Sequence, residues 1–124
     1  MEYKNLIQIR GVVKSAETVP YGQKHLCKFT VLTRYAYSGR NGDNVFEDTL
    51  HHCTAFSGQK IPVETLRKIQ SGTVVYVTGR QRHIRKKLDD GRETSRAEVY
   101  VSDVTVHKAA SNELNISQSI STTH

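Results

Sequence analysis

The strongest chemical feature of the sequence is a concentration of cations between residues 80 and 96. Seven of these residues are Lys or Arg and three are Asp or Glu, so the stretch carries a net charge of +4. Cations along an extended segment can neutralise the phosphates of a polyanion, and the release of counterions then drives binding. Such a run can also be an ordinary solvated face. We predict phosphate binding by five of these cations: Arg80, Arg82, Arg85, Lys86 and Lys87.

Aromatic residues beside basic ones form a second candidate site. Two tyrosines lie between Arg34 and Arg40, and Arg34 is predicted to add a phosphate contact. Rings can stack on any base, so aromatic side chains suit binding without sequence preference. Surface or core packing is the alternative role for these side chains. The predicted stacking residues are Tyr37 and Phe56, with Tyr35 and His52 as weaker candidates.

Two histidine and cysteine groupings raise the question of a metal site. His25 is close to Cys27, and His51 and His52 directly precede Cys53. Imidazole and thiolate are zinc ligands, but this spacing matches no usual zinc motif, and buried cysteine commonly behaves as a small apolar residue. A turn near residues 40–41 would let Cys27 and Cys53 face each other across antiparallel strands. We predict no metal and no cofactor, with a metal-dependent activity at these residues as an alternative.

Other enzyme motifs are missing from the sequence. We find no nucleophile elbow, no phosphate-binding loop and no paired-carboxylate site. We therefore predict that the protein is not an enzyme.

Composition limits the class of protein. The 124 residues suffice for one domain, and 18 Lys and Arg against 12 Asp and Glu give a formal net charge of +6, which points to an anionic partner. Hydrophobic residues make up 36% of the chain, so the core is small or is completed by another subunit. No run approaches the roughly 18 apolar residues of a membrane span, and the first residues lack the apolar core of a signal peptide. We expect a cytoplasmic protein with no membrane partner and with reduced cysteines.

The hydrophobic pattern predicts an all-β fold. Apolar and polar residues alternate with the strand period of two in several segments that are rich in β-branched residues. Pro62 and Gly72 bracket a segment with the expected helix asymmetry. The predicted strands are residues 6–13, 25–33, 47–57, 73–78 and 96–106, the helix is residues 59–70, and residues 14–24 and 34–44 are predicted loops.

These elements also place the candidate residues. Asp90-Gly91 is a strong hairpin signal, so residues 73–107 are predicted to form a projecting β-hairpin that carries the basic stretch. In the third strand, Cys53 belongs to the predicted core face, which leaves Phe56 on the opposite face. The two tyrosines that we interpret as packing residues are Tyr76 and Tyr100.

Five strands with one helix between the third and the fourth define the oligonucleotide/oligosaccharide-binding (OB) barrel, whose exposed strand face and loops hold the ligand. We predict one such domain over residues 1–108. Residues 109–124 are mostly Ser, Thr, Asn and Gln and cannot bury enough apolar surface to offset their ordering entropy, so they are predicted to form a polar tail.

Several motifs in this order resemble the bacterial single-stranded DNA-binding proteins. The resemblance implies a homotetramer or homodimer that binds single-stranded DNA without sequence preference and acts in DNA replication, recombination or repair, together with proteins of those processes. The motifs are IRGVV at residues 9–13, KFTVLT at 28–33, HHCTAFSG at 51–58, LRKIQSGTVVYVTG at 66–79, DGRE at 90–93 and EVYV at 98–101.

The resemblance also implies roles for individual residues. Phe56 matches the phenylalanine on which that family stacks bases, and Tyr37 falls near a tryptophan of the loop between the second and third strands. His51 matches a histidine near subunit contacts, and Tyr76 lies in a strand that tends to meet neighbouring subunits. His51 and Tyr76 are therefore the predicted interface residues.

Two departures from the family pattern affect the expected function. The chain has no Trp, and Leu50 and Lys86 stand near positions where the family usually has one, so charge must supply what stacking does not. The tail also lacks an acidic, aromatic tip. Two alternatives with the same fold follow: a primosome-type adaptor that binds DNA weakly and docks a replication protein, and an RNA-binding barrel.

Overall fold

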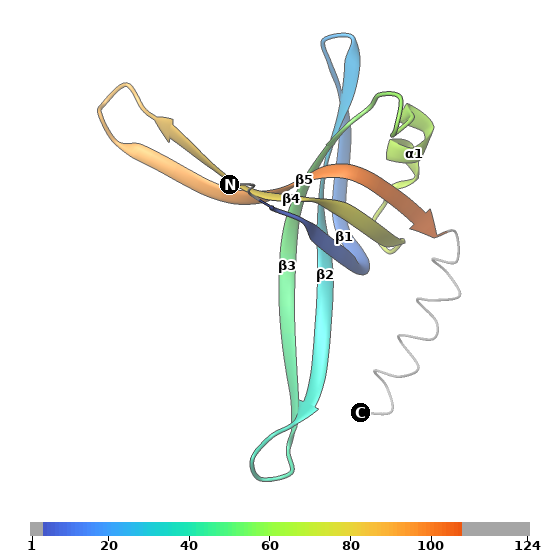
Figure 1. Ribbon diagram of the computed structural model, residues 1–124, viewed down its shortest axis with the longest axis vertical. Helices are drawn as coiled ribbons and strands as arrows, with labels where there is room; N and C mark the ends of the chain where they lie inside the picture. The colour runs from blue at the N-terminus through green and yellow to red at the C-terminus, as the bar shows by residue number, and fades with distance from the viewer. Residues whose placement is uncertain (1–3, 108–124) are drawn as a thin grey trace.

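The protein, represented by a computed structural model that describes residues 4–107, is a closed five-stranded barrel with the strand order β1-β2-β3-β5-β4 (Figure 1). All neighbouring strands are antiparallel except β3 and β5, which are parallel. One short helix in this part of the chain lies between β3 and β4. The predicted fold is confirmed. The elements are β1 (Ile7–Tyr21), β2 (Lys24–Ser38), β3 (Asn44–Phe56), α1 (Val63–Lys68), β4 (Val74–Lys87) and β5 (Glu93–His107).

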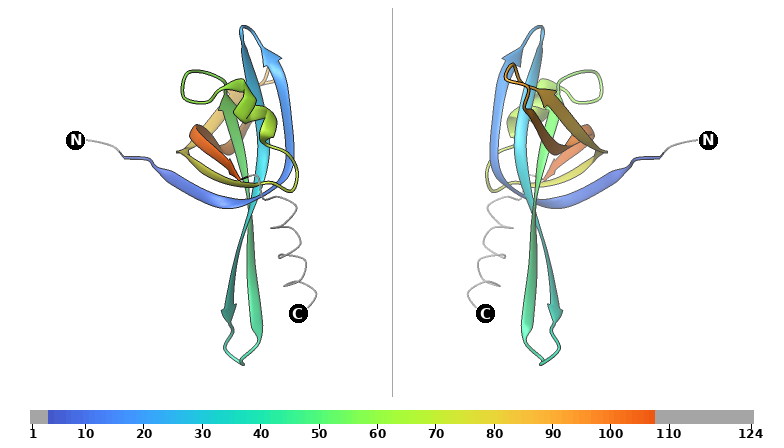
Figure 2. Two further views of the ribbon diagram at one scale, coloured as in Figure 1. Left: turned by 90° about the vertical axis from the view of Figure 1, so that its right-hand side faces the viewer. Right: turned by 90° about the vertical axis from the view of Figure 1, so that its left-hand side faces the viewer.

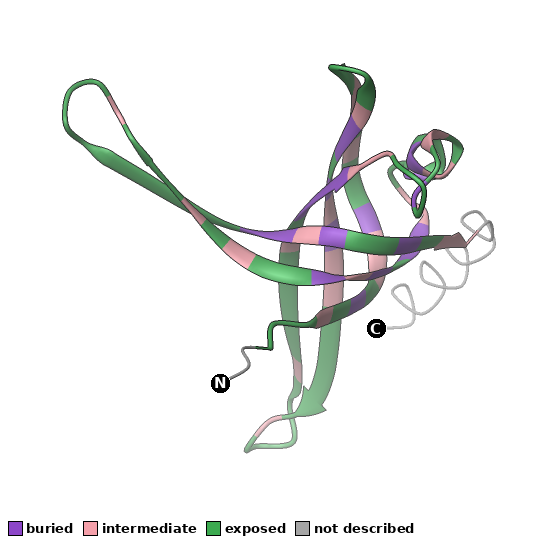
Figure 3. Cartoon of the chain, turned by 45° about the horizontal axis from the view of Figure 1, so that its top comes forward, coloured by how far each residue is buried: buried purple, intermediate pink, exposed green. Residues whose placement is uncertain are grey.

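Two hairpins extend well beyond the barrel. The ends of β2 and β3 pair only with each other, as do the ends of β4 and β5, so each pair projects as a two-stranded ribbon (Figures 1 and 2). We call residues 34–48 the β2–β3 arm and residues 80–96 the β4–β5 arm. Exposed residues predominate in both arms, whereas buried residues are concentrated where the strands enclose the barrel (Figure 3). The predicted projecting basic hairpin is the β4–β5 arm.

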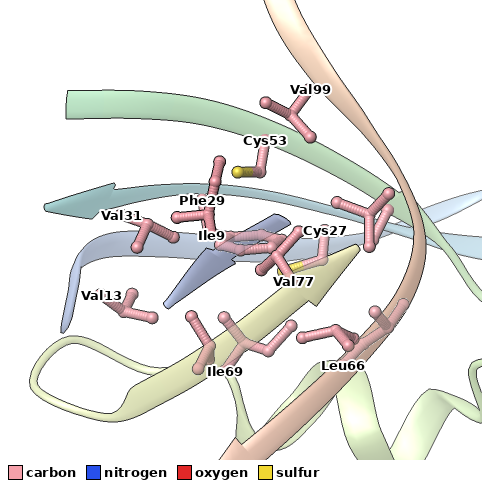
Figure 4. Packing of buried hydrophobic residues seen from close by; sticks show 14 of the residues in the cluster. Ile9, Val13, Cys27, Phe29, Val31, Cys53, Leu66, Ile69, Val77 and Val99 are labelled. Carbon is pink, nitrogen blue, oxygen red and sulfur yellow. The ribbon is translucent and has the colours of Figure 1, made fainter. Parts of the chain in front are cut away.

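Alternate side chains of the strands fill the barrel (Figure 4). In β2, Cys27, Phe29 and Val31 are all at most 2% exposed, as the period of two predicts. Leu66 of α1 is fully buried in the same cluster, so the helix packs against the barrel. Other members of the cluster are Ile9, Val13, Cys53, Ala55, Ile61, Ile69, Val75, Val77, Val99, Val101 and Val104.

The first strand is shared by both halves of the sheet. Residues 7–12 of β1 pair with β4, and residues 12–21 pair with β2. Gly11 lies next to this change of partner, where a Cβ atom would collide with the carbonyl group of Leu32. A glycine therefore permits the close backbone approach that the curved strand requires.

Both predicted loops are largely strand. β1 continues to Tyr21, and Gly22, with φ of 60°, forms the tight turn to β2. Pro20 is tolerated because this part of β1 pairs only with β2, which leaves its other edge open. β2 likewise continues to Ser38, so Tyr35 and Tyr37 lie on a strand and not in a loop. The Gly, Pro and Asn residues correctly indicated turns. They did not show that the strands continue almost to these turns.

The helix is shorter than predicted. It spans Val63–Lys68 because Pro62, the N-cap residue, is extended and a residue that precedes proline is disfavoured in a helix. Ile69 ends the helix with a ψ of 102°. The apolar positions Ile61, Leu66 and Ile69 are nevertheless all buried.

Within residues 4–107, no helix has the length and apolar character needed to span a membrane. The predicted polar tail, residues 109–124, lies outside the described residues.

Replacing Gly11 with alanine should destabilise the fold by about 2 kcal/mol, because the added methyl group forces the β1 backbone away from Leu32. Urea unfolding of both proteins measures the difference. Gly58→Ala is the matched control, since a Cβ atom at Gly58 meets nothing within 4 Å. Equal stabilities of wild type and Gly11→Ala would contradict the close approach of β1 and β2.

Candidate nucleic-acid interface

A groove of about 660 Å³ crosses the outer face of the strands. β1, β2, β3 and β5 all contribute to it, so the groove spans the seam at which β3 and β5 close the barrel. Its lining residues are Ser15, Ala16, Glu17, Lys28, Phe29, Thr30, His52, Cys53, Thr54, Arg96, Ala97 and Glu98.

The polar lining of the groove includes two cations, a histidine and two carboxylates, Glu17 and Glu98. Lys28 and Arg96 are exposed and line the groove, together with the predicted stacking residue His52. Neither cation was among the predicted binding residues. Strand parity contained a signal for Lys28, because the core residues Cys27 and Phe29 flank it in β2.

Three aromatic side chains form a row near one end of this face. Phe56, at the end of β3, lies between Tyr21 and Tyr100, with ring centroids 5.5 Å and 6.0 Å away. We call these three residues the aromatic row. Tyr100 packs on Phe56, as a packing residue should, but it is only partly buried. Tyr21 was not among the predicted stacking residues, because residues 14–24 were predicted to form a loop.

Two arginines of β4 cover the Tyr100 ring. The guanidinium carbon of Arg82 lies 4.4 Å from the ring centroid, and that of Arg80 lies 5.1 Å from it. Both distances fall within the range of cation–π attraction. The aromatic row therefore continues into the base of the β4–β5 arm.

A buried carboxylate holds one of these arginines. Glu98, which is 6% exposed, accepts hydrogen bonds at Oε1 from Arg82 Nε (2.8 Å) and at Oε2 from Thr54 Oγ1 (2.9 Å). Arg82 Nη2 is also 2.6 Å from Glu98 Oε1. Burial raises the pKa of Glu98, but hydrogen bonds from Arg82 and Thr54 and the charges of Arg82 and Arg96 outweigh it, so the pKa is lowered. Glu98 is therefore ionised at neutral pH.

The pleat of the β4–β5 arm divides its cations between two faces. Arg80 pairs with Tyr100 and Arg82 pairs with Glu98, which places both arginines on the groove side. By the same alternation, Arg85 and Lys87 lie on the opposite face. The groove-side cations of the arm are Arg80, Arg82, Lys86 and Arg96.

The β2–β3 arm separates the predicted residues in a similar way. Arg34 donates to Asp48 from Nε (2.6 Å) and Nη2 (2.9 Å) and lies 5.6 Å from the Phe46 ring. This pairing raises the pKa of Arg34 and lowers that of Asp48. Tyr35 and Tyr37 are 70% and 53% exposed, but strand parity puts them on the ribbon face opposite Arg34. Phe56 shares the face of Arg34, so the structure does not bring Tyr37 and Phe56 together.

The predicted interface residues lie on strands that are not neighbours in the sheet. His51 of β3 is partly buried, its Nε2 atom is 2.9 Å from Thr33 Oγ1, and burial lowers its pKa. Tyr76 of β4 is 39% exposed and pairs across the strands with Arg10.

The two cysteines are buried, free thiols. Cys27 pairs with Ala55 and Phe29 with Cys53, so the cysteines are diagonal neighbours across β2 and β3 and are not directly opposite each other. The register is centred on residue 41, within the predicted turn, whereas a directly opposed pair of cysteines would need a centre at residue 40. Burial raises the pKa of Cys53 to about 12, so the thiol is protonated at neutral pH. Among residues 4–107, no group of three or more His, Cys, Asp or Glu side chains is arranged to hold a metal.

No protein-family model and no curated protein sequence matches this chain. Solved structures do match it. One is the SSB of Plasmodium falciparum in complex with ssDNA, with a TM-score of 0.71, 16% sequence identity, and coverage of 86% of this chain and 95% of that chain. Another is a deletion variant of the single-stranded DNA binding protein from Thermus aquaticus, with a TM-score of 0.69 and 13% identity. That match covers 85% of this chain but only 51% of the Thermus chain. These similarities establish that the barrel is an OB fold.

Replacing Glu98 with glutamine tests the buried ion pair through the pH dependence of protein stability. Because the pKa of Glu98 is below its ordinary value of 4.5 in the folded protein, its charge stabilises the fold above that pH. This contribution is lost as the pH falls through the folded pKa. We expect wild type to be more stable than Glu98→Gln at neutral pH, with a difference that shrinks below pH 4.5. Urea unfolding of both proteins, from neutral pH to below pH 4.5, measures the difference in stability.

Asp48→Asn is the control for this experiment. Asp48 also pairs with an arginine, but its side chain is 43% exposed, so its ion pair should change stability little at any pH. A difference between wild type and Glu98→Gln that does not vary with pH would rule out a stabilising charge on Glu98.

Proposed function

We propose that the protein binds single-stranded DNA without sequence preference. The observation that carries the proposal is the aromatic row beside a groove lined by exposed cations. An aromatic surface accepts any base because every base has a π-face, and a neighbouring cationic groove can follow the phosphates. The similarity to two single-stranded DNA-binding proteins supports the proposal at the level of the fold.

The proposed path of the strand follows the groove face. Lys28 and Arg96 border the groove, and Arg80 and Lys86 continue the positive charge along the β4–β5 arm. Bases would stack on the exposed parts of the aromatic row, chiefly Tyr21, which is 59% exposed. Each phosphate contact releases counterions, so the logarithm of the affinity should fall linearly with the logarithm of the salt concentration.

The other predicted residues take a different place in this proposal. Arg85 and Lys87 form no ion pair within residues 4–107, and they would reach phosphates only from the far face of the arm. Arg34 is already paired with Asp48, which reduces its attraction for phosphate. Tyr35 and Tyr37 would bind bases only where a strand crosses to the opposite ribbon face.

Binding of labelled oligo-dT and of a duplex of equal length, each across a salt series, tests the proposal. We expect tight binding of oligo-dT alone. Tyr21→Ala and Phe56→Leu should each weaken oligo-dT binding about tenfold, because a stacking surface is lost. Phe56→Leu retains an apolar side chain at the partly buried position, so the fold should persist.

Tyr35→Ala is the matched control, since Tyr35 is a more exposed tyrosine on the opposite ribbon face. It should bind like wild type. An equal loss in Tyr35→Ala and Tyr21→Ala would contradict the path along the aromatic row. Equal, weak binding of oligo-dT and duplex would contradict the function itself and favour the adaptor. Stronger binding of oligo-rU than of oligo-dT would favour an RNA-binding barrel.

We further propose that the protein assembles as a homodimer or homotetramer and acts in DNA replication, recombination or repair in the cytoplasm. The exposed apolar side chains support assembly, since Leu6 is 64% and Tyr76 is 39% exposed. The implied cellular role follows from the resemblance to bacterial single-stranded DNA-binding proteins.

Light scattering after size-exclusion chromatography should give a multiple of the 14.0 kDa chain mass. Tyr76→Asp should shift the protein towards the monomer, because a charge at an apolar contact must be desolvated without a partner. Tyr35→Asp is the control and should leave the mass unchanged. A wild-type mass of one chain would contradict assembly.

A further inference from the structure

Arg82 differs from the other cations of the β4–β5 arm because its charge is paired with a buried carboxylate, whereas the other paired cation of the arm, Arg92, contacts the exposed Asp90. Its guanidinium group lies 2.6 Å from Oε1 of the buried Glu98, and Nε donates to the same oxygen. Thr54 holds the other carboxylate oxygen. Glu98 thus fixes the orientation of Arg82, and Thr54 holds Glu98 in place.

The paired charge makes Arg82 a poor phosphate ligand. The Arg82–Glu98 pair has no net charge, so a phosphate that approaches Arg82 also meets the field of a carboxylate. Arg80, in contrast, forms no ion pair within residues 4–107 and is exposed. Both arginines contact the Tyr100 ring, but only Arg80 can offer an uncompensated charge.

The side chain of Arg82 nevertheless remains partly exposed. Its guanidinium carbon lies 4.4 Å from the Tyr100 ring centroid, and 31% of the side chain is exposed. Tyr100 in turn lies next to Phe56 in the aromatic row. A planar guanidinium can stack on a nucleobase as an aromatic ring does, so the exposed side of Arg82 continues the row of flat surfaces.

We propose that Arg82 is a base-stacking residue and that Glu98 and Thr54 are positioning residues that hold its guanidinium in place. This inference rests on the proposed binding of single-stranded DNA. It changes the role predicted for Arg82 from a phosphate contact to a platform for a base. Arg80 is the phosphate contact at the same place.

Two probes separate these roles: oligo-dT and an abasic strand of equal length, each titrated across a salt series. Arg82→Ala should weaken oligo-dT binding about tenfold, with an unchanged salt slope and unchanged binding of the abasic strand. Arg80→Ala should weaken binding of both probes and reduce the magnitude of the salt slope by about 0.7, the value for one phosphate contact on a single strand.

Arg82→Lys keeps the positive charge but removes the planar guanidinium group. This variant replaces Arg82→Ala in the titrations if Arg82→Ala does not fold. It should also lose oligo-dT affinity with an unchanged slope. Glu98→Gln should free Arg82 as a cation, so that the abasic strand binds more tightly, the slope steepens by about 0.7, and the preference for oligo-dT over the abasic strand decreases. A merely structural role of Glu98 would weaken both probes without a change in slope.

The inference is overturned if Arg82→Ala weakens both probes equally and reduces the salt slope, or if Arg82→Lys binds oligo-dT like wild type. Failure of the wild-type protein to bind oligo-dT is a separate outcome that overturns the proposed function. The wild-type titration therefore distinguishes the two failures before any variant is compared.

Discussion

The structure depends on the seam at which β3 and β5 close the barrel. These strands are parallel and joined at only two register pairs, one of which is Thr54↔Tyr100. The buried hydrogen bond from Thr54 to Glu98 lies beside this pair. Because the seam brings the end of β3 against the base of the β4–β5 arm, it also places Phe56, Tyr100 and Arg82 on one surface. The contact between β3 and β5 that closes the barrel therefore also assembles the candidate site.

Ion pairing decides what each cation of this surface can do. Total charge favours an anionic partner, but a cation contributes to phosphate binding only where no carboxylate compensates it. Glu98 compensates Arg82, and Asp48 compensates Arg34. Lys28 and Arg96 line the groove and form no ion pair within residues 4–107. The binding chemistry therefore depends on the arrangement of the charges more than on their number.

Local pattern predicted the parts of the fold that local physics controls. Alternation explains the burial of Cys27, Phe29 and Val31, because side chains of a strand point to opposite faces in turn. The Asp90-Gly91 turn was also predicted, and Gly91 has a φ of 87°. The strand lengths were wrong because the pairing of β2 with β3 extends regular structure through polar residues that have little strand signal of their own. Those extensions form the exposed β2–β3 arm.

The sequence by itself determined the fold class, the core face of the third strand, the position of the basic arm and the outward direction of Phe56. Each of these depends on neighbouring residues or on a period of two. Only the tertiary structure decided that Tyr21 and Tyr100 flank Phe56 and that Glu98 holds Arg82. These contacts join residues far apart in the chain, and their existence depends on strand register and barrel closure, which no local pattern encodes.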